Sequence, residues 1–171
     1  MKNIFLVGLP SSGKTTLGKQ LARQLRYRFV DTDVLIVKEE GMSINAIFAQ
    51  KGEPYFREAE ARILRAIRPD SKLIVATGGG VPYFHDNMAY IKENGISVFL
   101  DVAPEEIVDR IQRHSSNDRP TYQKQDTQLL ENLQQRYRDR FPFYSQADFT
   151  LKGESLNIRQ LLNVLQEVVT V

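Results

Sequence analysis

Short apolar runs alternate with helical patterns along the chain. The runs at 3–7, 72–76 and 97–102 have the length and composition of strands, and the run at 148–151 is a weaker one. The pair Phe-Val at 29–30 leads into an acidic strand end. Between them, apolar residues recur at helical spacing, for example from Lys14 to Arg26 and again from about Leu156. Strands that alternate with helices predict an α/β fold, with a mostly parallel sheet covered by helices on both faces.

Two segments depart from this simple alternation. Residues 41–68 contain two helical patterns where one crossover helix would suffice, and residues 115–126 form a polar loop. Loops of that length are usually functional or disordered. We interpret both segments as insertions in one domain that spans residues 1–171. In open α/β sheets, ligands bind beyond the carboxyl ends of the strands, so the residues that follow each strand are the ones to examine.

Composition and charge narrow the class of protein. The chain has 171 residues, 42% hydrophobic and 26% charged, with a net charge of +2, which is too small to indicate a nucleic-acid or membrane partner. It has no cysteine, which rules out disulfides and thiolate metal sites. No apolar run approaches the ~18 residues of a membrane span, and the N-terminus lacks a signal-peptide cleavage site. We expect a cytoplasmic protein.

The strongest motif follows the first run. Gly8, Gly13, Lys14 and Thr15 match the P-loop pattern, with a strand before it and a helix after it. Glycines at these positions let the backbone N–H groups of the loop turn toward phosphate oxygens. Lys14 would lie along the β- and γ-phosphates, and the Thr15 hydroxyl would bind Mg²⁺. The motif predicts a nucleoside triphosphate site but leaves the acceptor open.

Two acids follow the second run. Asp31 and Asp33 are two residues apart and would point to one side if the strand continued through them. Such a pair suits the shell of a Mg²⁺ ion and the positioning of an acceptor hydroxyl. The alternative is that one of them is the N-cap of the next helix.

Glycines and arginines supply further candidates. Gly78, Gly79 and Gly80 follow the third run, either as a floor that a substrate can approach closely or as a flexible turn. Arg57 faces a ligand or forms only a surface ion pair with Glu60. Arg119 in the polar loop would close over ATP, or would be a solvated loop charge.

These motifs together resemble those of shikimate kinases. The family pattern appears in order as "GLPSSGKT", "DTD" (31–33), "GEPYFREAE" (52–60), "GGG" (78–80), "RP" (119–120) and "RFPFY" (140–144). The resemblance covers nearly the whole chain. It implies a three-layer sandwich with a five-stranded parallel sheet, a substrate-binding insertion at about 34–62 and a lid at about 115–126.

The resemblance also implies a reaction, transfer of the ATP γ-phosphoryl to the 3-hydroxyl of shikimate with Mg²⁺, and it implies roles for individual residues. Asp33 would orient or deprotonate the hydroxyl, and Asp31 would hold Mg²⁺ through water. The ATP site would comprise Ser11, Ser12, Gly13, Lys14, Thr15, Thr16 and Arg119. The shikimate site would comprise Asp33, Arg57, Gly78, Gly79, Gly80 and Arg140, with Phe48, Phe56 and Glu60 lining or supporting it.

Some points stay open. The lid reads "RPTY", where the family more often has apolar residues after Arg-Pro, and either Arg110 or Arg113 would stack on adenine. The rival enzymes are another small-metabolite kinase, such as a gluconate kinase, and a nucleotide kinase. The rival outside enzymes is a regulatory nucleotide-binding module, but Lys14, Asp33 and Arg57 are all present. We expect a monomer that binds neither nucleic acid nor membrane.

Overall fold

The computed structural model describes residues 1–115 and 127–169. Its centre is one sheet of five parallel strands in the order β2-β3-β1-β4-β5. The strands are β1 (Asn3–Val7), β2 (Arg28–Asp31), β3 (Leu73–Ala76), β4 (Gly95–Asp101) and β5 (Phe149–Lys152). The expected α/β class and the parallel sheet are confirmed.

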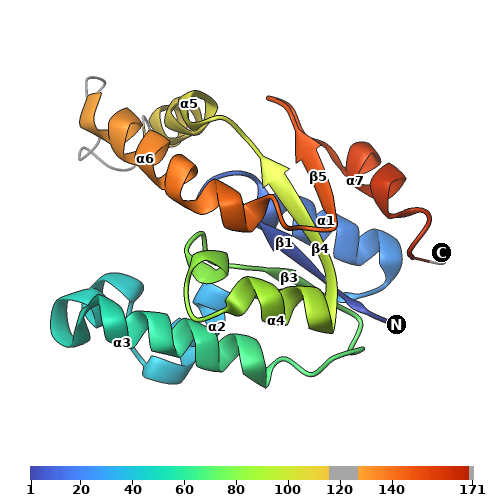
Figure 1. The fold of residues 1–171 in the computed structure, drawn as a ribbon, viewed down its shortest axis with the longest axis horizontal. Coiled ribbons are helices and arrows are strands. Elements are labelled where there is room, and N and C mark those ends of the chain that lie inside the picture. The colour runs from blue at the N-terminus through green and yellow to red at the C-terminus, as the bar shows by residue number, and fades with distance from the viewer. Residues whose placement is uncertain (116–126, 170–171) are drawn as a thin grey trace.

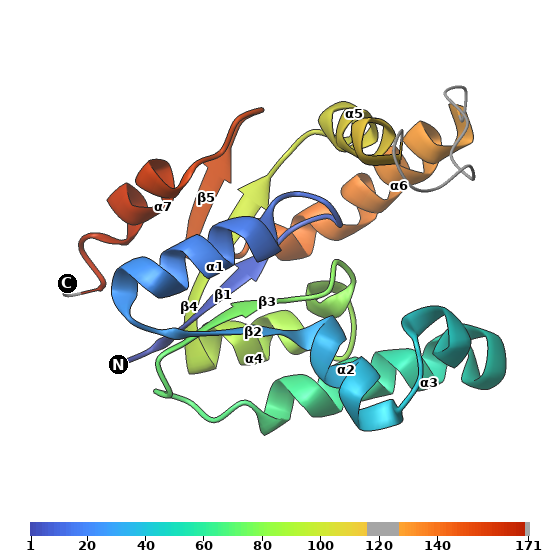
Figure 2. The same cartoon turned by 180° about the vertical axis from the view of Figure 1, so that it is seen from behind.

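Helices cover both faces of the sheet and complete the three layers (Figure 1, Figure 2). They are α1 (Lys14–Leu25), α2 (Thr32–Glu40), α3 (Ile44–Ala66), α4 (Asn87–Asn94), α5 (Pro104–Ser115), α6 (Thr127–Tyr144) and α7 (Ile158–Leu165), with a short 3-10 helix, η1 (Val81–Tyr83). Apolar side chains of α1 and α7 pack on one face, and those of α3 to α6 pack on the other. No helix in the described ranges is both long and apolar enough to cross a membrane.

The burial of the strands explains their order. Every residue of β1, β3 and β4 is buried, as expected of strands that have neighbours on both sides and helices on both faces. The strands β2 and β5 lie at the edges and keep exposed positions. Because all five run the same way, their carboxyl ends meet at one edge, and the two chain termini lie at the opposite end of the molecule (Figures 1 and 2).

The second strand is shorter than the pair of acids suggested. It ends at Asp31, and α2 begins at Thr32, so Asp33 lies in the first helical turn instead of continuing the strand. The N-cap alternative holds for Asp31, because its side chain accepts hydrogen bonds from the backbone N–H groups of Asp33 and Val34. Asp31, Thr32 and Asp33 therefore form a tight turn from β2 into α2. The expectation that the strand continues through Asp33 does not predict this turn.

The two helical patterns at 41–68 form one helix with a break in it. Gly52 has φ 82° and ψ 169° inside α3, and Pro54 follows it. The helices α2 and α3 enclose a small core of their own, built from Ile36, Ile47, Phe56, Ala59 and Ile63. This segment projects beyond the carboxyl edge of the sheet (Figure 1).

The start of β4 provides a test of how closely the sheet packs. A Cβ atom on Gly95 would lie 2.6 Å from the Asn3 carbonyl oxygen and 2.5 Å from the Phe5 ring. We expect Gly95→Ala to lower the free energy of unfolding by about 1–3 kcal/mol, because a backbone atom cannot yield as a side chain does. Chemical denaturation measures this, with exposed Glu93→Ala on α4 as the control. An unchanged midpoint for Gly95→Ala would contradict the packing.

Candidate active site

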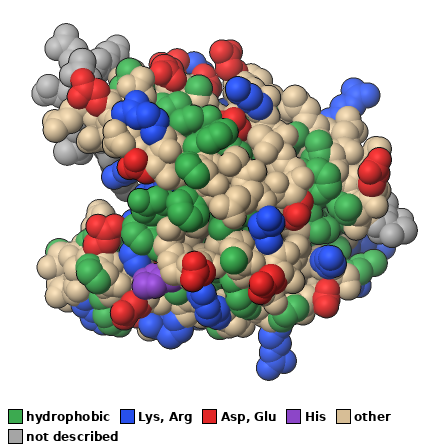
Figure 3. All heavy atoms as spheres, viewed as in Figure 1, with side chains coloured by type: hydrophobic (Ala, Val, Ile, Leu, Met, Phe, Trp, Pro, Cys, Tyr) green, Lys and Arg blue, Asp and Glu red, His purple; other side chains and the backbone are tan. Residues whose placement is uncertain are grey.

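A cleft of about 1080 Å³ opens at the carboxyl edge of the sheet. The surface is hollowed between the part formed by α5 and α6 and the part formed by α2 and α3 (Figure 3). The cleft is lined by the P-loop, by both strand-end acids, by two of the three glycines and by residues near the C-terminus, among them Ser11, Ser12, Gly13, Lys14, Thr15, Thr16, Asp31, Asp33, Thr77, Gly78, Gly79, Arg110, Arg136, Leu156 and Asn157. The P-loop, the acid pair and the first two of the three glycines therefore meet in one place, while Arg57 and Arg140 are not among the residues that line the cleft.

The P-loop lies between β1 and α1 and owes its shape to unusual backbone angles. Gly8 has φ 145° and Gly13 has φ 99°, values that side-chain-bearing residues rarely adopt. A Cβ on Gly8 would also lie 2.7 Å from the Leu100 carbonyl oxygen of β4. The loop can thus curl tightly against the sheet, and α1 directs its N-terminus into the cleft, where an anion would be stabilised.

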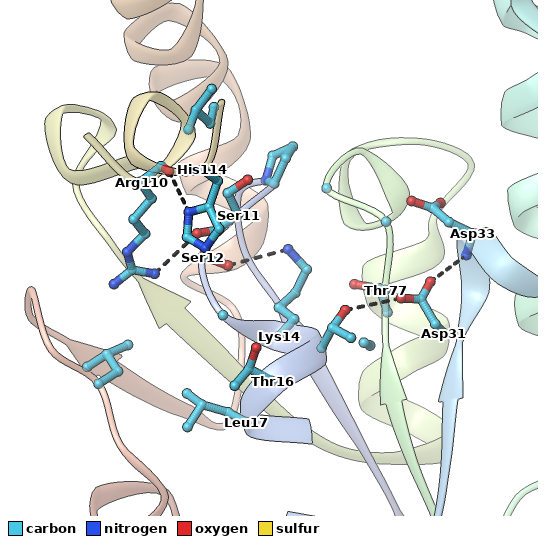
Figure 4. A pocket seen from close by; sticks show the side chains of 18 of the residues that line it. Ser11, Ser12, Lys14, Thr16, Leu17, Asp31, Asp33, Thr77, Arg110 and His114 are labelled. Carbon is cyan, nitrogen blue, oxygen red and sulfur yellow. Dashed lines mark hydrogen bonds between the residues drawn. The ribbon is translucent and has the colours of Figure 1, made fainter. Parts of the chain in front are cut away.

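Lys14 lies across the loop, between Ser12 and the two aspartates (Figure 4). Its ammonium donates hydrogen bonds to the carbonyl oxygens of Gly8 at 2.8 Å and Leu9 at 2.6 Å. Burial lowers the pKa of Lys14 to about 8, against the opposing effect of Asp33 and Asp31. With this pKa, Lys14 is largely charged at neutral pH. Its ammonium can exchange the two carbonyl oxygens for an anion, which is a stronger hydrogen-bond acceptor.

The two carboxylate oxygens of Asp31 have different partners. One oxygen caps α2, and the other accepts a hydrogen bond from the Thr15 hydroxyl at 3.2 Å. Both groups are oxygen ligands of the kind that Mg²⁺ prefers, and a Mg²⁺ ion usually keeps several waters besides. The residues present therefore fit a magnesium ion. The described residues hold no cluster of three or more metal-binding side chains of the His, Cys, Asp and Glu types.

The carboxylates of Asp33 and Glu60 both lie close to the backbone of Gly78. A Cβ on Gly78 would lie 2.8 Å from an Asp33 oxygen and 2.9 Å from a Glu60 oxygen. Burial raises the pKa of both groups, that of Glu60 to about 7, and the charge of Asp31 raises the pKa of Asp33 further. Lys14 and Arg57 act in the opposite direction on Asp33.

Gly78, Gly79 and Gly80 are needed because neighbouring atoms leave no space for a Cβ atom, and not because of their backbone angles. Positive φ values occur at other glycines of the described chain, but Gly78, Gly79 and Gly80 do not have them. A Cβ on Gly79 would lie 2.7 Å from Pro10 and 3.2 Å from the Arg140 guanidinium. One on Gly80 would collide with the Arg57 guanidinium. We call this bare backbone, residues 78–80, the glycine floor; Gly78 and Gly79 line the cleft.

Arg57 forms the ion pair with Glu60 that its sequence allowed, but not at the surface. Its guanidinium forms an ion pair with Glu60 at 2.7 Å and a weaker one with Glu53 at 3.2 Å. The same group lies 4.2 Å from the centre of the Phe84 ring, with Phe56 at 5.2 Å and Phe48 at 6.0 Å. The side chain is only 11% exposed, so this is no solvated surface pair.

Arg140 and Tyr144 approach the glycine floor from α6, one helical turn apart. The Tyr144 hydroxyl donates a hydrogen bond to the Gly79 carbonyl, and the Arg140 guanidinium lies beside Gly79. Burial raises the pKa of Tyr144 to about 12, while Arg140 opposes that shift. The motif "RFPFY" therefore places one cation and one neutral donor on the floor.

Arg110 and Arg113, the two candidates for stacking on adenine, differ in their position relative to the cleft. Arg110 lines the cleft and donates a hydrogen bond to the Ser11 carbonyl at 3.2 Å (Figure 4). It donates a second one to the Glu154 carbonyl at 2.8 Å. Arg113 instead lies on the outer side of α5, 70% exposed, with Asp109 3.8 Å away. Of the two, Arg110 is the one that lines the cleft.

Sequence reasoning missed several residues of the cleft. Thr77 follows β3 directly, so the rule that ligands bind after strands would have found it. Asn157 is the N-cap of α7 in a capping box with Gln160, a pattern readable from the sequence. His114 on α5 is exposed and also lines the cleft, and no sequence motif points to it. Arg119 and, apart from Ser115 at the end of α5, the lid predicted at about 115–126 lie outside the described residues.

Comparison with known proteins gives a consistent result. The family model described as shikimate kinase matches residues 10–170. A shikimate kinase of Clostridium botulinum (strain 657 / Type Ba4) is 40% identical over 147 residues, which are 86% of this chain and 85% of that protein.

Solved structures agree with the family match. A crystal structure of shikimate kinase from Bacteroides thetaiotaomicron matches with a TM-score of 0.87 at 34% identity, over 96% of this chain and 98% of that chain. A shikimate kinase from Acinetobacter baumannii in complex with shikimate has a TM-score of 0.85 at 28% identity, over 99% of this chain and 96% of that one. Because the family model spans residues 10–170 and a relative is 40% identical over 86% of this chain, this chain belongs to the shikimate kinase family.

Proposed function

We propose that this chain transfers the γ-phosphoryl of ATP to the 3-hydroxyl of shikimate, giving shikimate 3-phosphate and ADP. One observation carries the proposal. The P-loop and the glycine floor meet at Pro10 and Gly79, so a phosphate cradle and a site with Arg57, Arg140 and Asp33 share one wall. A triphosphate and a hydroxylated anion would therefore lie next to each other.

The donor side would be formed by the P-loop and its neighbours. The backbone N–H groups of the loop and the N-terminus of α1 would bind the phosphates. Lys14 would exchange the carbonyls of Gly8 and Leu9 for phosphate oxygens. Thr15 and, through water, Asp31 would hold Mg²⁺, which neutralises charge on the phosphates when bound. Arg110 would contact the base.

The acceptor side would recognise shikimate by its charge and its hydroxyls. Arg140 lies beside Gly79 and Arg57 beside Gly80. Both would bind the carboxylate, which suits the planar fork of a guanidinium. The floor lets the ring approach the backbone closely. Shikimate carries one carboxylate and several hydroxyls, so this arrangement explains why two arginines stand beside an acid in a nearly neutral protein.

Asp33 would act on the attacking hydroxyl. As the bond forms between the 3-hydroxyl oxygen and the γ-phosphorus, the bond from that phosphorus to the bridging oxygen breaks and ADP departs. The hydroxyl proton passes to the Asp33 carboxylate. A carboxylate with a raised pKa accepts a proton more readily at neutral pH than an ordinary aspartate does.

The proposal predicts which acceptor stimulates ADP release. Purified protein with MgATP should release ADP rapidly with shikimate and only at the background rate with gluconate or a nucleoside monophosphate. Neither rival acceptor combines a ring carboxylate with hydroxyls at the shikimate spacing. Stimulation by gluconate or a nucleotide, with none by shikimate, would assign the cleft to one of the rival kinases.

Replacing the proposed base separates binding from chemistry. We expect Asp33→Asn to lower kcat at least ~100-fold, within the range that general base catalysis contributes, while the Kd of ATP stays within about twofold. Asp139→Asn on the exposed face of α6 is the matched control. Steady-state kinetics and calorimetry measure the two quantities, and a near-normal kcat for Asp33→Asn would remove Asp33 from the proton transfer.

A further inference from the structure

The glycine floor raises a question that its own residues do not answer. Three consecutive glycines lose more conformational freedom on folding than other residues would, and they have no side chains to fix them. The proposed reaction nevertheless needs this backbone at a defined distance from Asp33 and the arginines. Its C-terminal side is fixed by η1, where the Val81 and Tyr83 N–H groups donate to the Gly78 and Gly80 carbonyls, both at 3.0 Å.

The first side chain that fixes the floor is Thr32. Its hydroxyl oxygen accepts a hydrogen bond of 2.9 Å from the Gly78 N–H. Thr32 is fully buried and stands between Asp31 and Asp33 at the start of α2. The bond thus joins the floor to the helical turn that carries Asp33, whose carboxylate lies against Gly78 itself.

The second is Tyr144, on the other side of the floor. Its hydroxyl donates to the Gly79 carbonyl, and its buried ring packs on Phe99 of β4 with 5.1 Å between ring centres. Tyr144 follows Arg140 by one turn of α6, so this bond joins the floor to the helix that carries Arg140. Each bond therefore connects the floor to an element that bears a proposed substrate-binding residue.

We propose that Thr32 and Tyr144 are positioning residues that pin the Gly78 N–H and the Gly79 carbonyl, and so set the gap between the glycine floor and Asp33 on one side and Arg140 on the other. This inference rests on the proposed function. Thr32 is the middle residue of "DTD" and Tyr144 is the last residue of "RFPFY". Both contact the glycine floor, while the neighbouring residues of these motifs would bind the substrate.

The two pins are expected to act on different steps. Thr32→Val keeps the shape of the side chain and removes the acceptor of Gly78, so the floor shifts relative to Asp33. We expect kcat with shikimate to fall about tenfold. Tyr144→Phe removes one oxygen beside Arg140, and we expect the KM for shikimate to rise about fivefold or more. The KM for ATP should stay within twofold in both variants.

Matched controls separate positioning from general loss of stability. Thr32→Ser keeps the hydroxyl and should retain near-normal kinetics. Tyr90→Phe also removes a tyrosine hydroxyl bonded to backbone carbonyls, those of Arg65 and Ile67, but away from the cleft, and should change none of the constants. If Thr32→Val does not fold, Tyr144→Phe alone still tests the pinning.

A direct readout uses the amide of Gly78. The chain has 10 glycines, so ¹⁵N-glycine labelling gives a simple amide spectrum in which hydrogen exchange can be followed residue by residue. We expect the Gly78 amide to exchange about tenfold faster in Thr32→Val than in the wild type, and at the wild-type rate in Thr32→Ser and Tyr90→Phe. This readout needs neither ATP nor turnover.

The outcomes are distinct. Faster Gly78 exchange together with losses confined to shikimate kinetics supports the pinning. Unchanged Gly78 exchange in Thr32→Val, or an equal rise of both KM values in Tyr144→Phe, overturns it. If the wild type does not turn over shikimate, the proposed function fails, and Gly78 exchange still decides whether Thr32 holds the floor.

Discussion

The approach of charged side chains to a backbone without Cβ atoms is the constraint on which the rest of the site depends. Asp33 and Glu60 lie against Gly78, Arg140 lies beside Gly79, and Arg57 lies over Gly80. An alanine at any of these three positions would displace a charged group. Four elements that are far apart in the sequence, namely the P-loop, α2, α3 and α6, can meet only because this stretch takes so little space.

The same constraint determines the electrostatics. Buried or half-buried charges are costly unless they are paired, and here acids and bases compensate one another. Glu60 pairs with Arg57, while Lys14 and Arg57 favour the charged form of Asp33 against burial and against Asp31. The balance leaves two carboxyls with raised pKa values beside two arginines. Such a site is prepared to accept an anion and a proton, which is what phosphoryl transfer to a hydroxylated acid requires.

Much of this arrangement was predictable from the sequence. The rest could not be predicted, and the physical reasons can be named. The P-loop, the strand-end acids and the three glycines are local patterns with a fixed relation to strands, so the parallel sheet alone brought them to one edge. The turn at Asp31 was ambiguous because the same residue suits a strand end and an N-cap. The contacts of Thr32 with Gly78, and of Tyr144 with Gly79, join segments over 45 residues apart, and no local pattern encodes them. The choice of Arg110 over Arg113 likewise depends on which face of α5 turns inward.

The central claim is that shikimate lies on the glycine floor with its 3-hydroxyl toward Asp33 and its carboxylate between Arg57 and Arg140. A crystal structure of this protein with MgADP and shikimate tests it most directly. The account predicts that the 3-hydroxyl oxygen lies about 2.6–3.2 Å from an Asp33 oxygen, within hydrogen-bonding distance. It also predicts that both guanidinium groups contact the carboxylate. A shikimate whose carboxylate faces Lys14, or whose 3-hydroxyl points away from Asp33, would contradict the account.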